Sequence, residues 1–344
     1  MITDKNFKIK EYNDPDKWIE DIRQFTYSPF LHKDWILSMS SGNDKPVFID
    51  IYTDNEKTAK ISGIISQTKF FGKQIYFYSG PALKTKAPNT YLEIVNALKD
   101  HFIKQKFSRI VIGSYGSPFA PEIRVNSFHP FRRKEFIIDL SGNFQKKYSR
   151  NIKRNITKAF ALNLESGINK TDIETIKKLL EETRHYRTKN RKNDYDPLPL
   201  PFLTYETLNK LLQNKNSIIY SIRTVKKTIG FLLIFGTHPV AEALLIGTDK
   251  NYYNKGISPF VYDFAFKDLK EKNYTIVNLG GIPVGKDGEM LAHFKKSLGA
   301  QEVTVHGATT NFLTYPYKLL NPLLNIGRKL PKNNPAVAFL KKFL

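Results

Sequence analysis

The order of strand-like and helix-like segments restricts the fold of this chain more than any other feature of its sequence, because both halves show a similar order. In the first half, β-prone segments precede a helical stripe of apolar residues at 91–105, and two short strands follow it. The strand-like segments lie at 45–52, 61–68, 73–78, 109–113 and 135–140. This mixture of strands and helices predicts an α+β fold with a mixed sheet.

The second half opens with helical patterns and continues with strands. Thr171 and Glu174 have the spacing of a capping box, and Ser258 with Pro259 suits the N-cap and first position of a later helix. Helices are predicted at 147–160, from 171, at 205–213 and from 258 to 272, with strands at 218–223, 229–235, 241–247 and 276–279. A chain of 344 residues suits two domains, which we place at 1–140 and 141–308, with a tail at 309–344.

The charge of the chain is strongly positive. It carries 54 basic and 32 acidic residues, a formal net charge of +22. The excess lies in the second half and the tail, because 141–308 holds 27 basic and 16 acidic residues and 309–344 holds 6 and none. Such a field favours anionic partners: phosphates, nucleic acid or acidic lipid headgroups. A genome-wide preference for lysine codons is the alternative explanation of the total net charge, although it does not explain why the basic residues cluster.

Composition also excludes several classes of site. The chain has no cysteine, which rules out disulfides, zinc–thiolate sites and cysteine nucleophiles. Its seven histidines form no HExxH motif or closely spaced pair, so we expect no metal site. The first residues are polar, and no apolar run approaches the ~20 residues needed to span a bilayer. We therefore expect a cytoplasmic protein, with peripheral contact at the inner membrane face left open.

Three segments resemble the FemABX and BioF2-like families of the GNAT superfamily. They are Ile138-Asp139-Leu140-Ser141 with Tyr148–Ala159, Leu279-Gly280-Gly281-Ile282, and His293–Ala300. Their order and spacing also agree with these families. The resemblance implies tandem GNAT-like domains, each a mixed, mainly antiparallel sheet flanked by helices.

The same resemblance implies a function. It implies transfer of an acyl or aminoacyl group onto an amine, with no tightly bound cofactor and with acyl-CoA or aminoacyl-tRNA as co-substrate. In the peptidoglycan members, which serve cell-wall biogenesis, the donor is aminoacyl-tRNA and the acceptor is a muropeptide precursor. The resemblance therefore favours an anionic acceptor of the cell envelope.

The basic segment at 146–159 has two faces when it is drawn as a helix. At about 100° per residue, Tyr148, Ile152, Ile156 and Ala159 share one narrow arc. The opposite face carries Lys146, Lys147, Arg150, Lys153, Arg154 and Lys158. Because like charges at helical spacing repel, this face suits an anionic counterpart. Lys147, Arg150, Lys153 and Arg154 are candidate phosphate ligands for the acceptor or for tRNA; a solvated lysine-rich helix is the alternative.

The turn at 253–258 precedes a helix. GNAT enzymes place a Q/R-x-x-G-x-[GA] loop there, whose backbone N–H groups hold the CoA pyrophosphate at the positive helix end. The resemblance makes Gly256, Ile257 and Ser258 candidate cofactor-binding residues. Tyr253 replaces the family's Gln or Arg, and Ser258 replaces the final small residue, which argues against assuming CoA as the donor. A simple capped loop is the alternative.

Amine acylation needs a base, a polarised carbonyl and an acid for the leaving group. Glu242 is the first candidate base, because an acid within a predicted strand requires an explanation. Asp263, Tyr252 and Tyr253 are further catalytic candidates beside the same predicted groove, which we place between the 146–159 helix and the Gly256 loop. Lys295 and Lys296, in a family-like segment, are candidate contacts for an anionic substrate. For all of them an ordinary surface or capping role is the alternative.

The tail at 309–344 mixes apolar and basic residues and holds no acid. This composition suits an interfacial segment on an anionic membrane, and a segment packed across the domains is the alternative. Two further functions stay open at this point. One is an acyl-CoA-dependent N-acyltransferase of a lipid or sugar amine, and the other is a nonenzymatic nucleic-acid-binding protein.

Overall fold

The computed structural model describes residues 6–68, 71–117, 119–191, 196–283 and 286–330. The chain forms two compact units, Met1–Arg132 with Val305–Leu344, and Arg133–Thr304. This division differs from the predicted domains at 1–140 and 141–308, because strands β7 (Phe128–Asp139) and β13 (Gln301–Thr310) each have residues in both units. Residues 331–344 of the predicted tail lie outside the described part.

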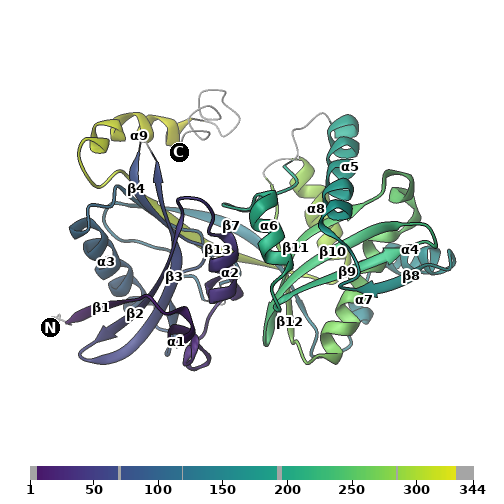
Figure 1. The fold of residues 1–344 in the computed structure, drawn as a ribbon, viewed down its shortest axis with the longest axis horizontal. Coiled ribbons are helices and arrows are strands. Elements are labelled where there is room, and N and C mark those ends of the chain that lie inside the picture. Colours follow the sequence, from purple (N-terminus) through teal and green to yellow (C-terminus); the bar gives the residue numbers. More distant parts are fainter. Residues whose placement is uncertain (1–5, 69–70, 118, 192–195, 284–285, 331–344) are drawn as a thin grey trace. The chain divides into compact units, whose positions relative to one another are not determined.

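The first unit is a mostly antiparallel sheet with helices (Figure 1). Its strand order is β1-β2-β3-β4-β6-β13, with β4 and β6 parallel and the other neighbours antiparallel. The elements are β1 (Phe7–Tyr12), α1 (Pro15–Ile19), α2 (Lys33–Met39), β2 (Lys45–Thr53), β3 (Glu56–Thr68), β4 (Gly72–Phe77), β5 (Ala82–Leu83, paired with β3), α3 (Pro88–Lys104), β6 (Arg109–Ile112) and α9 (Asn321–Lys329). Of the apolar stripe predicted at 91–105, Val95, Leu98 and Phe102 are buried on α3, and Leu92 is partly buried against the same core.

The second unit has the strand order β7-β12-β11-β10-β9-β8 (Figure 1). Only β11 and β12 are parallel among the described neighbours, so the prediction of a mixed, mainly antiparallel sheet is confirmed. The elements are α4 (Arg150–Phe160), β8 (Glu165–Ile168), α5 (Ile173–Arg191), α6 (Tyr205–Leu212), β9 (Ser217–Arg223), β10 (Thr228–Thr237), β11 (Val240–Thr248), α7 (Ile257–Glu271), β12 (Ile276–Gly281) and α8 (Lys286–Ser297).

Helices α5 and α7 cover opposite faces of this second sheet. A methyl group built on Gly230 of β10 would meet Ile257 of α7, whereas one built on Gly247 of β11 would meet Leu179 of α5. Glycine at these positions lets each helix approach the strands closely. Among the described residues, none of the helices has the length and apolar character needed to cross a bilayer.

Two predicted helix starts are wrong. Asp172, not Thr171, caps α5, because its Oδ1 accepts the N–H of Thr175 at 2.8 Å. Helix α7 begins at Ile257 with Gly256 as its N-cap, so Ser258 lies inside the first turn. The observed caps lie one residue after Thr171 and two residues before Ser258, which is within the usual uncertainty of a helix boundary.

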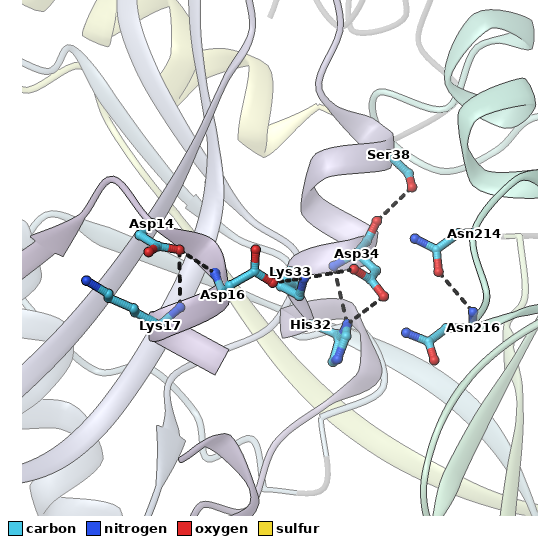
Figure 2. A network of polar contacts seen from close by, with 9 residues as sticks. All are labelled: Asp14, Asp16, Lys17, His32, Lys33, Asp34, Ser38, Asn214 and Asn216. Atoms are coloured by element: carbon cyan, nitrogen blue, oxygen red, sulfur yellow. Dashed lines mark hydrogen bonds and ion pairs between the residues drawn. The ribbon is translucent and has the colours of Figure 1, made fainter. Parts of the chain in front are cut away.

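Polar contacts fix the first helices of the first unit (Figure 2). The carboxylate of Asp14 caps α1 by accepting the N–H groups of Asp16 at 3.0 Å and Lys17 at 3.2 Å. The Nδ1 atom of His32 accepts the Asp34 N–H at 3.2 Å at the start of α2. Lys33 joins the two helices by pairing with Asp16.

A ring of alternating charges lies between β2, β3 and the segment after α1. The Nζ atom of Lys60 lies 2.6 Å from Asp21 and 2.7 Å from Asp50, and that of Lys57 lies at the same two distances from them. Lys60 and Asp50 are fully buried. Because each charge has two partners of opposite sign, the ring offsets the cost of taking the charges out of water.

We predict that Asp50→Ala lowers the free energy of unfolding of the first unit by about 3–5 kcal/mol, because Lys60 would be left buried with one partner fewer. Urea unfolding followed by the fluorescence of Trp18 and Trp35, both in this unit, measures the change. Glu56→Ala is the control, since this exposed residue makes only a 3.4 Å ion pair with Lys84 and should cost under about 1 kcal/mol. Equal losses for the two variants would contradict the assignment.

Candidate functional site

The two parallel strands of the second unit pair over a short stretch only. The pairs are Val240 with Ile276, Ala241 with Val277, and Glu242 with Asn278. Both strands then continue, β11 to Thr248 and β12 to Gly281, without further pairs in the described ladder. A register shift between β10 and β11 at the same place leaves Leu244 as an extra residue, which is a β-bulge. Strand divergence thus begins at Glu242.

A cluster of buried polar side chains lies where the strands diverge. Glu242 on β11 and Glu135 on β7 are each only 2% exposed. The Nδ2 atom of Asn278 donates to Oε2 of Glu135 at 2.9 Å, and Arg133 pairs with the same carboxylate. The Oε1 atom of Glu242 is buried and has no hydrogen-bond partner among the described residues.

The environment of Glu242 favours its neutral form. Burial raises the pKa of Glu242 well above its usual value, and the nearby charge of Glu135 raises it further. A hydrogen bond from Asn278 and the charge of Arg133 act in the opposite direction. A carboxyl with a raised pKa is a stronger base than an ordinary one, which suits the predicted role of a general base.

Lys295 and Lys296 lie in different environments, although they are adjacent on α8. Lys295 is buried, and its Nζ donates to the carbonyl oxygens of Leu279, Gly280 and Gly281 at 2.6, 3.0 and 2.7 Å. Burial lowers the pKa of Lys295 to about 7, although the charge of Glu135 opposes this shift. All three N–H groups of the ammonium therefore bind the end of β12, rather than the anionic substrate that we predicted. Lys296 is exposed and pairs with Glu302 at 2.8 Å.

The other predicted catalytic residues lie on α7 and in the 3-10 turn at Lys250–Lys255. Asp263 is buried and binds Gln145 at 2.7 Å, Tyr148 at 3.2 Å and Lys267 at 2.7 Å, so it holds α7 against the segment before α4. Tyr252 packs on the hydrophobic core, and Tyr253 stacks on Tyr186 with ring centroids 3.9 Å apart. These contacts give Asp263 and the two tyrosines structural partners.

The Gly256 turn lies directly against α4. Gly256 has φ +79°, and a methyl group there would lie 2.1 Å from the carbonyl oxygen of Asn155. The Nζ atom of Lys158 donates to the carbonyl of Asn254 at 2.7 Å. At this point the backbones touch, with no space for a groove between them. The N–H groups of Ile257 and Ser258 belong to the first turn of α7, where they lack intrahelical partners.

The predicted cationic helix has the expected two faces. Ile152 and Ala159 are buried, and Ile156 is partly buried against the same core. The exposed side chains are Lys146, Lys147, Arg150, Lys153, Arg154 and Lys158, with Lys146 and Lys147 in the 3-10 turn that precedes α4. Arg154 donates to Asn151 at 3.0 Å. The structure therefore presents these cations to solvent, with Lys158 bound to the turn before α7.

Sequence reasoning missed Glu135, Arg133 and Asn278. Glu135 carried the same signal as Glu242, since it is an acid at the start of the predicted strand 135–140. Asn278 carried no signal, because its contact with Glu135 joins strands that are far apart in the sequence. Arg133 lies two residues before Glu135, outside the predicted strand 135–140.

We predict that Gly256→Ala destabilises the second unit by more than the ~1–2 kcal/mol of left-handed backbone strain, because the methyl group also meets the Asn155 carbonyl. Gly42→Ala is the control, since Gly42 has φ +57° and no atom within 4 Å of the added methyl group. Thermal unfolding of both variants measures the difference. A loss for Gly256→Ala no larger than that for Gly42→Ala would show that α4 moves aside without cost.

The chain is similar to known proteins in its structure rather than in its sequence. No protein-family model and no curated protein sequence matches the chain. The crystal structure of FemX is similar with a TM-score of 0.66 at 10% identity, covering 92% of this chain and 99% of FemX. L-PGS from Bacillus licheniformis has a TM-score of 0.55 at 14% identity, over 94% and 100%. A tandem GNAT protein from the clavulanic acid biosynthesis pathway has 0.52 at 9%, over 90% and 99%. The predicted tandem GNAT-like fold is confirmed, and the chain shares the fold of FemX.

Proposed function

We propose that this protein is an acyl- or aminoacyl-transferase that forms an amide on an amine of an anionic acceptor. The fold that it shares with FemX, L-PGS and a tandem GNAT protein supports this class of reaction. The observation that carries the proposal is the buried carboxyl of Glu242 at the point where β11 and β12 diverge, whose Oε1 has no hydrogen-bond partner among the described residues. Our leading acceptor is a cell-envelope precursor, either a peptidoglycan precursor or a lipid-linked one.

The chemistry follows from the groups at this point of the sheet. The acceptor amine forms a bond to the acyl carbon while its proton passes to Glu242, and the bond from that carbon to the tRNA oxygen or the CoA sulfur breaks. The leaving group takes up a proton, for which Tyr252 and Tyr253 stay our candidate donors. Leu244 is the extra residue of the bulge, so its N–H is our candidate donor to the acyl oxygen.

The acceptor site in this proposal includes the exposed cations of α4 and of the 3-10 turn before it. Lys147, Arg150, Lys153 and Arg154 would bind phosphate groups of the acceptor or of tRNA. No acidic side chain occurs between residues 140 and 164, so no acid within this segment competes with a phosphate group for these cations.

Two donors fit the proposal to different degrees. An acyl-CoA pyrophosphate would lie on the N–H groups of Gly256, Ile257 and Ser258, at the positive end of α7. The tight contact of Gly256 with Asn155 is enough to explain why glycine occupies position 256, so this glycine is not evidence for a bound cofactor. Aminoacyl-tRNA is therefore our preferred donor, because the cationic surface suits a polyanion. An acyl-CoA-dependent N-acyltransferase is the second candidate.

Peripheral contact with an anionic membrane is part of this proposal. Four large apolar side chains of the C-terminal segment are more than half exposed: Tyr315 (73%), Leu319 (70%), Leu323 (56%) and Ile326 (57%). Phe312 and Leu324 are buried, so the segment is anchored on the first unit. Lys318, Arg328 and Lys329 lie among the exposed apolar residues, and no acid follows Glu302. This combination suits the interface of an anionic bilayer.

We predict that Arg150→Ala combined with Arg154→Ala raises the KM for the acceptor by about tenfold or more, because charge-assisted hydrogen bonds contribute about 1.5–3 kcal/mol each. Amide formation is assayed with aminoacyl-tRNA in one series and acyl-CoA in another, which also identifies the donor. Arg124→Ala with Arg132→Ala is the control, since it removes the same charge from two exposed sites of the first unit. Unchanged acceptor kinetics would remove α4 from the proposed site, and no transfer from either donor would refute the function.

We predict that Leu319→Glu with Leu323→Glu weakens binding to vesicles that contain anionic phospholipid by tenfold or more. Each leucine that passes from water into the bilayer contributes about 1.5–3 kcal/mol to binding. Vesicle sedimentation with anionic and zwitterionic lipid measures this. Val225→Glu, at a fully exposed position of the second unit, is the control. Binding that is insensitive to the double substitution, or equal for both lipids, would assign the apolar surface to another partner, such as a second copy of the chain.

A further inference from the structure

A cluster of three cationic side chains lies in the first unit, where the ends of β6, β7 and β13 come close to α9. Its members are Arg109 on β6, His129 on β7 and Arg328 on α9. Burial and the charge of Arg328 lower the pKa of Arg109 to about 10, and the same two causes lower the pKa of His129. No carboxylate among the described residues opposes these shifts. The three groups therefore repel one another, and an anion beside them would offset this repulsion.

Neutral side chains hold Arg328 in place. Its Nη1 donates to Oδ1 of Asn325 at 3.0 Å and to Oδ1 of Asn311, and Asn311 donates in turn to the same Asn325 oxygen at 3.3 Å. Because an amide oxygen carries no net charge, these bonds orient the guanidinium without neutralising it. The Nε and Nη2 atoms have no partner among the described residues. These two atoms present the parallel N–H groups with which arginine binds a phosphate at two points.

The backbone of α9 and the strand side of the cluster are also fixed. The side chain of Asn321 binds both the N–H and the carbonyl of Phe312, at 2.8 and 3.0 Å, which anchors the start of α9 just after β13. The Nε atom of Arg109 donates to Oγ1 of Thr309 at 3.2 Å, two residues before Asn311. Both guanidiniums are therefore attached, through neutral partners, to the same end of β13.

We propose that Arg109, His129 and Arg328 form a binding site for a phosphate group. A phosphate supplies negative charge and several acceptor oxygens for guanidinium and imidazole N–H groups. The inference goes beyond the proposed function, since the cluster belongs to the first unit, whereas Glu242 and α4 belong to the second. Two sources supply this group: a soluble phosphate ester and a phospholipid headgroup. We favour the headgroup, because α9 also carries the exposed apolar side chain of Ile326.

The test measures binding of phosphate probes to the full chain. Glycerol phosphate in calorimetry represents the soluble source, with glycerol as its neutral control. Vesicles of phosphatidylcholine that contain phosphatidic acid represent the lipid source, with vesicles of phosphatidylcholine alone as their control. Saturable binding of glycerol phosphate without a preference for the anionic vesicles assigns the site to a soluble ester. A preference for the anionic vesicles that depends on Arg328 assigns it to a phospholipid.

Two neighbouring residues of α9 give a matched pair of variants. Arg328→Gln removes the charge and the two-point contact, so we expect about a tenfold or greater loss of affinity for the bound probe. Lys329→Gln removes an equal charge from the next position and should bind like the parent, and both side chains are exposed, so both variants should fold. Absence of binding to either probe, or equal losses in the two variants, would overturn the proposal.

The titration of His129 separates a formed site from diffuse attraction. Among the described residues, Arg328 and Asn311 are the groups that act on His129 in addition to burial. A bound phosphate favours the imidazolium, so the pKa of His129 should rise when the probe saturates the protein. NMR of the histidine rings follows this titration, with glycerol phosphate or with short-chain phosphatidic acid as the probe. An unchanged pKa of His129 at saturation would contradict the proposed site.

Discussion

The short pairing of β11 with β12 is the constraint on which the second unit depends. Parallel strands that stay paired bury their backbone groups in the ladder, but here the ladder covers three residue pairs. Beyond it, the carbonyl groups at the end of β12 need other partners, and Lys295 binds three of them. The bulge at Leu244 bends β11 at the same place. Divergence, bulge and buried lysine therefore form one arrangement, and Glu242 lies at its centre.

The first unit contains the corresponding parallel pair but keeps it together. Beyond the ends of β4 and β6, the N–H of Gly113 still binds the Phe77 carbonyl at 2.7 Å, and the N–H of Tyr115 binds the Tyr78 carbonyl at 2.6 Å. The side chains that follow are aromatic and packed, with Tyr78 against Phe30 and Trp35. Continued pairing and aromatic packing distinguish this pair from β11 and β12. This contrast explains why we place the chemistry in the second unit.

Close backbone packing determines where the cationic surface lies. Gly256 allows the turn before α7 to touch the Asn155 carbonyl of α4, and Lys158 reaches the Asn254 carbonyl across the same contact. Lys158 of α4 is thereby held near the N-terminus of α7, where unpaired N–H groups add partial positive charge. In the proposed function this is one continuous surface for phosphate groups, built from segments about a hundred residues apart in the sequence.

The sequence by itself determined what depends on local periodicity and composition. The strands at 45–52, 229–235 and 241–247 were predictable as runs of apolar, β-prone residues. The helical stripe at 91–105 and the two faces of the 146–159 segment were predictable because the helical spacing of apolar residues reports which side is buried. Glu242 was also predictable as an exceptional residue, since an acid within an apolar strand requires an explanation.

Tertiary structure decided the rest. Neighbouring lysines on α8 became a buried and an exposed one, Asp263 acquired three partners, and Glu135 and Asn278 joined Glu242. These outcomes depend on strand order and register between distant segments, which fix the partners and burial of a charge and which local sequence does not encode.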